Sequence, residues 1–264
     1  IHTAMTVSMV LLDRPIALPE RENERELQNR FPELGASLID GESDETTATL
    51  NLDGGTVILG NMPGPLPWSD FEGLCKTSTL WKNAEDDIKK HRAYLVVTLS
   101  SELDKVEQAI RLTKATAAAL TATDAAIGVY WVNAPLIAPK EIFLDFTTGI
   151  LPRRPPIHIW VDVQVGWKDE GASYGYTRGM EALGFKEIEV PTSPERPHEL
   201  RERLHDLAVY LIMNGSIIRH GDTIGRNMRE KIQVVFSNSA FGHKNRVMRL
   251  DYELFKPKPW WQFW

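Results

Sequence analysis

The chain has 264 residues, of which 42% are hydrophobic and 25% are charged. This balance excludes an intrinsically disordered chain, which carries fewer apolar residues and a larger net charge. The longest apolar runs, at positions 94–99 and 207–213, are much shorter than the roughly 18 to 20 residues that a membrane-spanning helix needs. We therefore expect a folded globular protein with no membrane span.

The net charge of −6 is unevenly distributed along the chain. Residues 1–150 include 22 acidic and 13 basic residues, a net charge of −9, whereas residues 151–264 include 14 and 17, a net charge of +3. An acidic surface repels the phosphates of nucleic acids and attracts cationic partners. We therefore expect a protein partner with a basic surface, and no nucleic acid. The single cysteine, Cys75, excludes an internal disulfide and favours a cytoplasmic location.

The first 150 residues predict strands that alternate with helices. Alternating side chains on both sides of Asp53-Gly54-Gly55 predict a tight hairpin at 49–60, because glycine accepts positive φ. A loop with Pro63, Pro65 and Pro67 follows, since three prolines in five positions prevent regular structure. The other predicted strands are 6–12, 93–99 and 126–132, and the predicted helices are 19–31, 69–74, 83–90, 101–120 with Ser101 as its N-cap, and 139–146.

The remaining residues predict a second set of strands around one long helix. The predicted strands are 157–166, with a hairpin return through 171–177, then 185–190, 231–236 and 247–252, and the predicted helical segments are 179–183 and 196–213. Hairpins mixed with helices favour an α+β fold of largely antiparallel sheets with packed helices, in two similar-sized halves. The proline-rich stretch 151–156 suggests the boundary. We expect an acidic N-terminal α+β subdomain at 5–150, a C-terminal α+β subdomain at 151–256 and an aromatic tail at 257–264.

One face of the strand predicted at 157–166 is a candidate ligand site. Its alternation directs Ile157, Ile159, Val161, Val163 and Val165 to the core and leaves a second face with His158, Trp160, Asp162 and Gln164. Packed helices cover such faces more often than ligands do. A small-ligand site or a hydrolase-type active site on this face is therefore the alternative interpretation.

Motifs for catalysis and for cofactor binding are missing. The sequence has no G-x-S-x-G, no Walker loop and no G-x-G-x-x-G. On the helix predicted at 196–213, His198, Glu202 and His205 share one face and could approach a metal, but charged residues on such a helix usually form its solvated side. We expect no metal and no cofactor, and a non-catalytic protein more than an enzyme.

The segment Gly221-Asp222-Thr223-Ile224-Gly225 resembles a loop that holds a phosphate or a metal. It precedes a predicted strand and lacks the lysine and the helix start of phosphate-binding loops. Turn preferences favour a structural role, in which Asp222 accepts backbone N–H groups, both glycines take unusual dihedral angles and Ile224 packs in the core.

Two segments are candidates for partner binding. The densest acidic cluster, for which a solvated loop is the alternative, consists of Asp40, Glu42, Asp44 and Glu45. The aromatic tail includes Trp260, Trp261, Phe263 and Trp264. Each ring can bury about 150 to 250 Å², so we expect the tail to pack on the body of the protein, on a partner or on a lipid surface. Because aromatic residues dominate the energetics of interfaces, we predict that Trp260, Trp261 and Trp264 contact a partner.

Several segments together resemble the bacterial family called domain of unknown function 4261. They include VSMVLLDRP, GGTVILGNMPGPLPWSDFEGLCKTSTLW, HRAYLVVTL, IGVYWVNA, IHIWVDVQV, LGFKEIEVPTSP, LAVYLIMNGSIIRHGDTIG and RLDYELF. The residues that look like signatures of the family are Pro63, Pro65, Pro67, Trp68, Glu72, Cys75, Gly221, Asp222, Thr223 and Gly225. The resemblance implies no activity, because the family is defined by sequence.

These observations favour a non-catalytic protein-binding module. Its more specific form is a cytoplasmic immunity or inhibitor protein that neutralises a bacterial toxin domain, since an acidic inhibitor suits a basic toxin.

Overall fold

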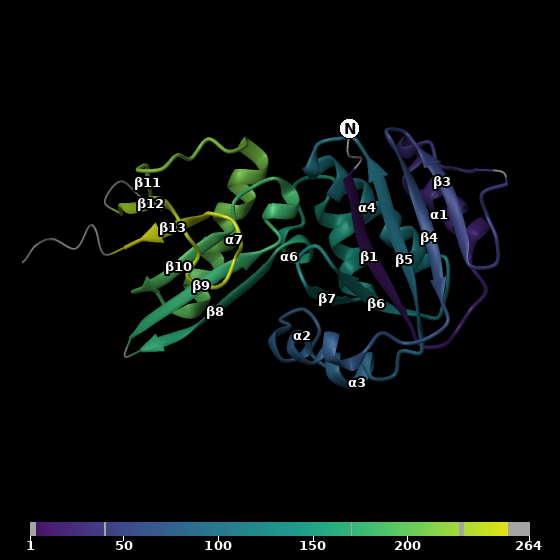
Figure 1. The fold of residues 1–264 in the computed structure, drawn as a ribbon, viewed down its shortest axis with the longest axis horizontal. Coiled ribbons are helices and arrows are strands. Elements are labelled where there is room, and N and C mark those ends of the chain that lie inside the picture. The colour runs from purple at the N-terminus through teal and green to yellow at the C-terminus, as the bar shows by residue number, and fades with distance from the viewer. Residues whose placement is uncertain (1–3, 40, 170, 227–229, 253–264) are drawn as a thin grey trace, which may run out of the picture. The chain divides into compact units, whose positions relative to one another are not determined.

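The computed structural model describes residues 4–39, 41–169, 171–226 and 230–252. They belong to two compact units, residues 1–160 and 161–264 (Figure 1). Both units combine helices with a mostly antiparallel sheet, which confirms the predicted α+β class. Among the described residues, no helix is both long enough and apolar enough to cross a membrane.

The first unit is built on a seven-stranded sheet in the order β2-β3-β4-β5-β1-β6-β7, in which every neighbouring pair is antiparallel. The strands are β1 (Ala4–Leu12), β2 (Ser37–Leu38), β3 (Thr47–Leu52), β4 (Gly55–Met62), β5 (Ala93–Ser101), β6 (Ala126–Trp131) and β7 (Leu136–Pro139). The α-helices are α1 (Glu20–Arg30), α2 (Glu72–Thr77), α3 (Ala84–Ile88), α4 (Lys105–Thr121), α5 (Lys140–Asp145) and α6 (Ile157–Trp160).

Helix α4 covers one face of this sheet. It packs on β1 and β5, and its buried side includes Leu112, Ala115 and Ala119. In β5, alternate residues are buried, as expected for a strand with one face against a helix. The buried hydroxyls of Ser8 and Thr116 form a hydrogen bond of 2.6 Å, so the two polar groups satisfy each other inside the core.

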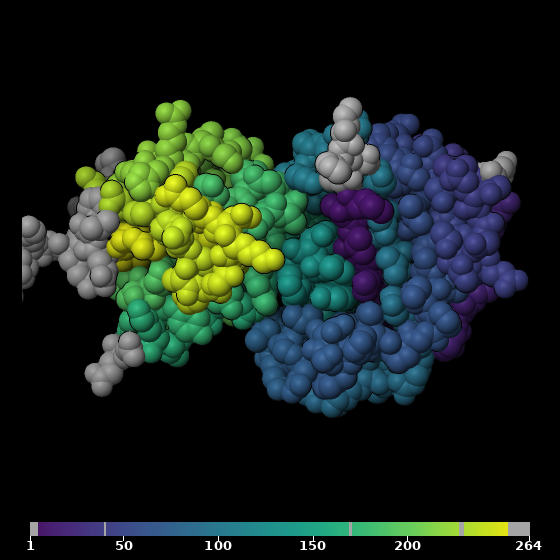
Figure 2. All heavy atoms as spheres, viewed as in Figure 1, coloured from purple at the N-terminus to yellow at the C-terminus, as the bar shows by residue number. Residues whose placement is uncertain are grey.

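The other face is only partly covered. Helices α2 and α3 pack over one end through a cluster that contains Leu11, Phe71, Trp81, Ile88 and Ile137. Towards the start of β1 the face is open, and Figure 2 shows purple atoms of this strand at the surface of the unit. On this side Met5 is 62% exposed.

The second unit has a six-stranded sheet in the order β11-β12-β13-β10-β9-β8, in which β10 and β13 form the one parallel pair among the described strands. Its elements are β8 (Asp162–Asp169), β9 (Ala172–Arg178), β10 (Ile188–Ser193), α7 (Pro197–Asn214), β11 (Thr223–Ile224), β12 (Ile232–Ser237) and β13 (Val247–Asp251). Helix α7 packs on β8 and β9. Gly175 allows this close packing, because a Cβ at that position would lie 2.9 Å from Leu204 Cδ1.

Three details of the sequence prediction are wrong. Residues 157–160 form helix α6, so the predicted strand begins only at Asp162. Ser101 ends β5 and donates to the carbonyl of Gly54 (2.6 Å), whereas the N-cap of α4 is Asp104, whose carboxylate accepts the N–H groups of residues 106 and 107. The strand predicted at 185–190 runs from Ile188 to Ser193.

Candidate binding cleft

Helix α7 forms one wall of a cleft in the second unit. Its buried side, which includes Leu200, Leu204 and Leu211, is fixed against the sheet. The helix ends where Gly215 takes a φ of 79°, which favours glycine, and donates its N–H to the carbonyl of Leu211 (2.8 Å). Residues 216–226 then return beside the helix and form the opposite wall.

The cleft has a volume of about 790 Å³ and a mixed lining. Its apolar lining comes from Leu207, Tyr210, Ile217, Ile218 and Ile224. Its charged lining comes from Arg203, Asp206, Asp222 and Arg226. Since binding sites combine an apolar surface with a few polar groups, the cleft has the composition of a binding site.

The segment 221–225 is attached to the neighbouring backbone, and residues 222–225 of it line the cleft. Gly221 has a φ of 91° and donates its N–H to the carbonyl of Val234 (2.8 Å). The carboxylate of Asp222 accepts the N–H of Arg219 (2.8 Å). Two parts of the prediction are wrong: Ile224 is only half-buried, and Gly225 does not have positive φ. Gly225 is needed for another reason, because a Cβ there would lie 2.2 Å from the carbonyl oxygen of Glu230.

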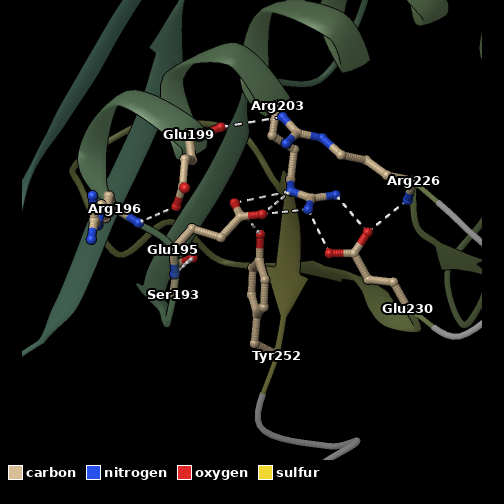
Figure 3. Close-up of polar contacts among 8 residues, drawn as sticks. All are labelled: Ser193, Glu195, Arg196, Glu199, Arg203, Arg226, Glu230 and Tyr252. Carbon is tan, nitrogen blue, oxygen red and sulfur yellow. Dashed lines mark hydrogen bonds and ion pairs between the residues drawn. The ribbon is translucent and has the colours of Figure 1, made fainter.

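A network of polar contacts includes Arg203 and Arg226, which line the cleft (Figure 3). The guanidinium of Arg203, which is 6% exposed, contacts two carboxylates. Its Nε donates to Glu195 Oε1 (2.9 Å), and its Nη2 donates to Glu230 Oε1 (2.5 Å). Glu230 also accepts the backbone N–H of Arg226 (2.6 Å), and Tyr252 Oη donates to Glu195 (3.1 Å). The network therefore connects α7, the far wall of the cleft and the end of the sheet.

The pKa shifts in the network maintain its charges. Burial raises the pKa of Glu230, but the N–H of Arg226 and the guanidinium of Arg203 outweigh this effect and lower the pKa overall. Burial alone would lower the pKa of Arg203, yet its bonds to Glu195 and Glu230 raise it. Burial and the negative charge of Glu195 raise the pKa of Tyr252, whose hydroxyl therefore remains a donor. Glu195 and Glu230 carry two formal negative charges and Arg203 and Arg226 two positive ones, and ion pairs join Arg203 to the two carboxylates.

Two acidic side chains and two apolar side chains complete the cleft surface. Asp206 and Asp222 are exposed, and within the described part of the chain Asp206 has no hydrogen-bond or ion-pair partner. Tyr210 is 45% exposed and Ile217 is 54% exposed. Because the arginine network is internally balanced, Asp206 and Asp222 give the cleft a negative charge beside an exposed apolar surface.

The predicted ligand face is not a single face of a strand. Trp160 belongs to α6, is 1% exposed and donates its indole N–H to Thr113 (2.8 Å). His158 is exposed on the same helix. Asp162 begins β8 and accepts hydrogen bonds from Arg178 (2.8 Å) and Gln164 (2.8 Å). The four residues were predicted together because a strand period was assigned across a helix.

The predicted acidic cluster and tail are only partly described. Asp40 and the tail residues Trp260, Trp261 and Trp264 lie outside the described residues. Glu42, Asp44 and Glu45 are exposed. The carboxylate of Asp44 accepts the N–H groups of Thr46 (2.7 Å) and Thr47 (2.8 Å), and these bonds lower its pKa. Asp44 therefore stabilises a turn.

The other signature residues lie in the first unit and have structural contacts. Pro63 and Pro65 are exposed, and their loop is held by His91, whose Nε2 accepts the N–H of Leu66 (2.9 Å). Lys89 lies 4.7 Å from the ring centre of Trp68. The carboxylate of Glu72 accepts a bond from Lys76 (2.7 Å), and burial raises the pKa of Cys75.

The acidic side of α7 does not form a metal site in the described residues. His198 and Glu202 are exposed, and His205 is half-buried. Among the described residues, no three histidine, cysteine, aspartate or glutamate side chains lie together so that they could hold a metal ion.

Comparison with known proteins identifies one family. Residues 176–251 match the family described as "Domain of unknown function (DUF4261)". No curated protein and no solved structure matches the chain. The matched residues include all of α7 and every residue that lines the cleft. The predicted resemblance is therefore confirmed over residues 176–251, and the cleft lies within the part of the chain that is similar to the DUF4261 family.

Proposed function

We propose that this protein is a protein-binding module and that the cleft between α7 and residues 216–226 receives a partner segment with apolar and basic side chains. The observation that carries the proposal is the exposed apolar lining of a cleft whose unbalanced charges are acidic. Tyr210 and Ile217, both about half exposed, lie in the same cleft as Asp206 and Asp222. Exposed apolar patches surrounded by polar groups are typical of interaction sites.

The geometry suits an interface hot spot. Aromatic and apolar side chains that become fully buried supply most of the affinity of an interface, whereas rim charges mainly determine orientation and association rate. Tyr210 and Ile217 would supply affinity when the partner buries them. Asp206 and Asp222 would influence orientation and association rate, because both carboxylates are exposed to an approaching cation.

A bacterial toxin domain with a basic surface is the specific partner that we propose. The acidic charges of the cleft suit such a surface, and the acidic balance of residues 1–150 supports the same class of partner. In this form the protein is an immunity protein or a toxin inhibitor, and binding alone is its function.

The alternative of a ligand site around His158, Trp160 and Asp162 has less support. The indole of Trp160 is buried and hydrogen-bonded to Thr113. Asp162 is paired with Arg178. Both groups therefore already have structural partners, whereas the carboxylate of Asp206 has none among the described residues.

Calorimetric titration of the full chain with the purified product of the neighbouring gene tests the proposal. Ile217→Asp should weaken binding by about tenfold or more, because it places a charge in the apolar centre of the contact. Met62→Asp is the matched control, since Met62 is 41% exposed in the first unit and does not line the cleft. Equal dissociation constants for the two variants would reject the cleft as the binding site. Absence of binding to a basic neighbouring product would reject the toxin-inhibitor form.

A further inference from the structure

We propose that residues 253–264 of the same chain occupy the cleft when no partner is bound. This inference rests on the proposed function, because it assigns a competing ligand to the same site. A partner must then displace residues 253–264 before it can bind in the cleft.

The first argument is the point at which this segment is attached. Tyr252 precedes it directly, and the Tyr252 hydroxyl donates to Glu195 (3.1 Å). Glu195 accepts a bond from Arg203 (2.9 Å), and Arg203 lines the cleft. The residue before the segment is therefore two hydrogen bonds from the cleft (Figure 3). Twelve extended residues span on the order of 40 Å, so the cleft is within reach.

The second argument is chemical complementarity. Residues 253–264 contain Lys256 and Lys258, followed by the aromatic residues Trp260, Trp261, Phe263 and Trp264. The cleft offers acidic and apolar groups in turn, the carboxylates of Asp206 and Asp222 beside Tyr210 and Ile217. The segment thus has the same combination of cations and apolar rings that the cleft requires of a partner. Pro257, between the two lysines, and Pro259, before Trp260, restrict the chain, which reduces the entropy lost on docking.

Residues 253–264 and a partner would compete for the same cleft. A ligand that is tethered by a short linker reaches an effective concentration on the order of millimolar. Even weak intramolecular docking would therefore reduce the apparent affinity for a partner, and a partner would bind more tightly once the segment is displaced.

Site-specific cross-linking in the full chain tests the inference. In a Cys75→Ser background, one variant combines Ile217→Cys with Gln262→Cys, and a comparison variant combines Ala240→Cys with Gln262→Cys. Ile217 lines the cleft, whereas Ala240 is exposed and does not. A short bismaleimide should cross-link the first pair within a monomer at least about tenfold faster than the second, because docking raises the effective concentration of position 262 at the cleft. Tyr210→Cys provides a second cleft position if Ile217→Cys disturbs folding.

Three further variants separate docking from random collision. Trp260→Ser combined with Trp261→Ser should abolish the preference for the cleft position. Asp206→Asn should slow the cleft reaction by about two- to fivefold, the effect of one exposed ion pair. Glu202→Gln should leave it unchanged, since Glu202 is an exposed acid of the same helix that does not line the cleft.

Equal rates at the two positions would overturn the inference, and so would cross-linked dimers in place of monomers, because a second copy would then be the occupant. The cross-linking and partner-binding measurements distinguish failure of this inference from failure of the proposed function. If cross-linking shows no preference while Ile217→Asp still weakens partner binding, the inference fails and the proposed function stands. If cross-linking is faster at the cleft position but Ile217→Asp leaves the dissociation constant for the partner unchanged, the proposed function fails.

Discussion

Arg203→Met should destabilise the second unit, because it removes the one positive charge that is shared by two carboxylates. The methionine side chain retains most of the aliphatic volume of arginine, so packing changes little. Glu195 and Glu230 would then face each other without the guanidinium. They are 14% and 27% exposed, so water compensates them only partly.

The structure sets the size of this effect. Breaking a buried ion pair by removal of one partner costs about 3 to 5 kcal/mol. The lower end applies here, because Glu230 keeps the N–H of Arg226 (2.6 Å) and Glu195 keeps the hydroxyl of Tyr252 (3.1 Å). We therefore expect a loss of about 3 kcal/mol in the free energy of unfolding. With an m-value of about 2 kcal/mol per molar urea, the unfolding midpoint falls by about 1.5 M.

Urea unfolding followed by circular dichroism measures this shift. Arg201→Met is the matched control, because Arg201 lies on the same helix, is half-buried and has no ion pair in the described part of the chain. A substitution of this kind should cost less than about 1 kcal/mol. A midpoint shift below about 0.5 M for Arg203→Met, or one equal to that of the control, would refute the reasoning about two unpaired carboxylates.

Three other predictions concern individual contacts. Gly128→Ala should lower the free energy of unfolding by about 1 to 3 kcal/mol through overpacking, since its Cβ would lie 2.4 Å from the Trp81 ring. Gly73→Ala is the control and should not destabilise the protein, because its Cβ would meet no atom within 4 Å. Thermal unfolding of the two variants measures the difference. Asp104→Ala should cost about 1 kcal/mol in urea unfolding, as the loss of an N-cap does. Burial raises the pKa of Glu187 above its usual 4.5, so the folded state binds this proton more tightly than the unfolded state. The stability of the wild-type protein should therefore decrease as pH rises from 4.5 to the raised pKa. Glu187→Gln should lack that decrease when urea midpoints are measured between about pH 4 and pH 8. Identical pH profiles of the two proteins would contradict a raised pKa of Glu187.

Local patterns predict most of the elements, because the strands and the long helices each have one buried face. Residues 93–101 alternate between buried and half-exposed positions, which matches the period of two that predicts β5. The hairpin at Asp53-Gly54 and the end of α7 at Gly215 follow from glycines with φ of 80° and 79°. Signals of this kind are local, so they can be read without knowledge of the partner elements.

The failure at residues 157–161 has a physical cause. Apolar and polar residues alternate there, but the segment Ile157–Trp160 is too short to establish a period. Tertiary contacts decide its conformation instead. Ile157, Ile159 and Trp160 are all buried, and the Trp160 indole finds its acceptor on α4, at Thr113. An acceptor 47 positions away in the sequence cannot be inferred from the local pattern.

The sequence analysis did not predict the cleft, because the contacts that form it are also distant in the sequence. Its residues come from a helix and from a loop, and each appears ordinary when considered alone. Arg203 reads as a solvated charge on an amphipathic helix, although it is 6% exposed. A weak signal was present, because Arg203 lies among Leu200, Leu204 and Leu207 on the buried side of the helical period. An arginine on the buried side of a helix requires acidic partners, and Glu195 and Glu230 are those partners.

The segment 221–225 shows how a structural motif can also shape a binding site. Gly221 takes a positive φ and donates its N–H to Val234 of β12, and Gly225 permits a close backbone approach to Glu230. These contacts fix the main chain of one cleft wall, which leaves the side chains of Asp222 and Thr223 exposed along it. A wall whose backbone is already fixed adds little backbone ordering cost when a ligand binds. The turn chemistry that argued against a phosphate loop thus also places an acidic side chain, Asp222, along the cleft.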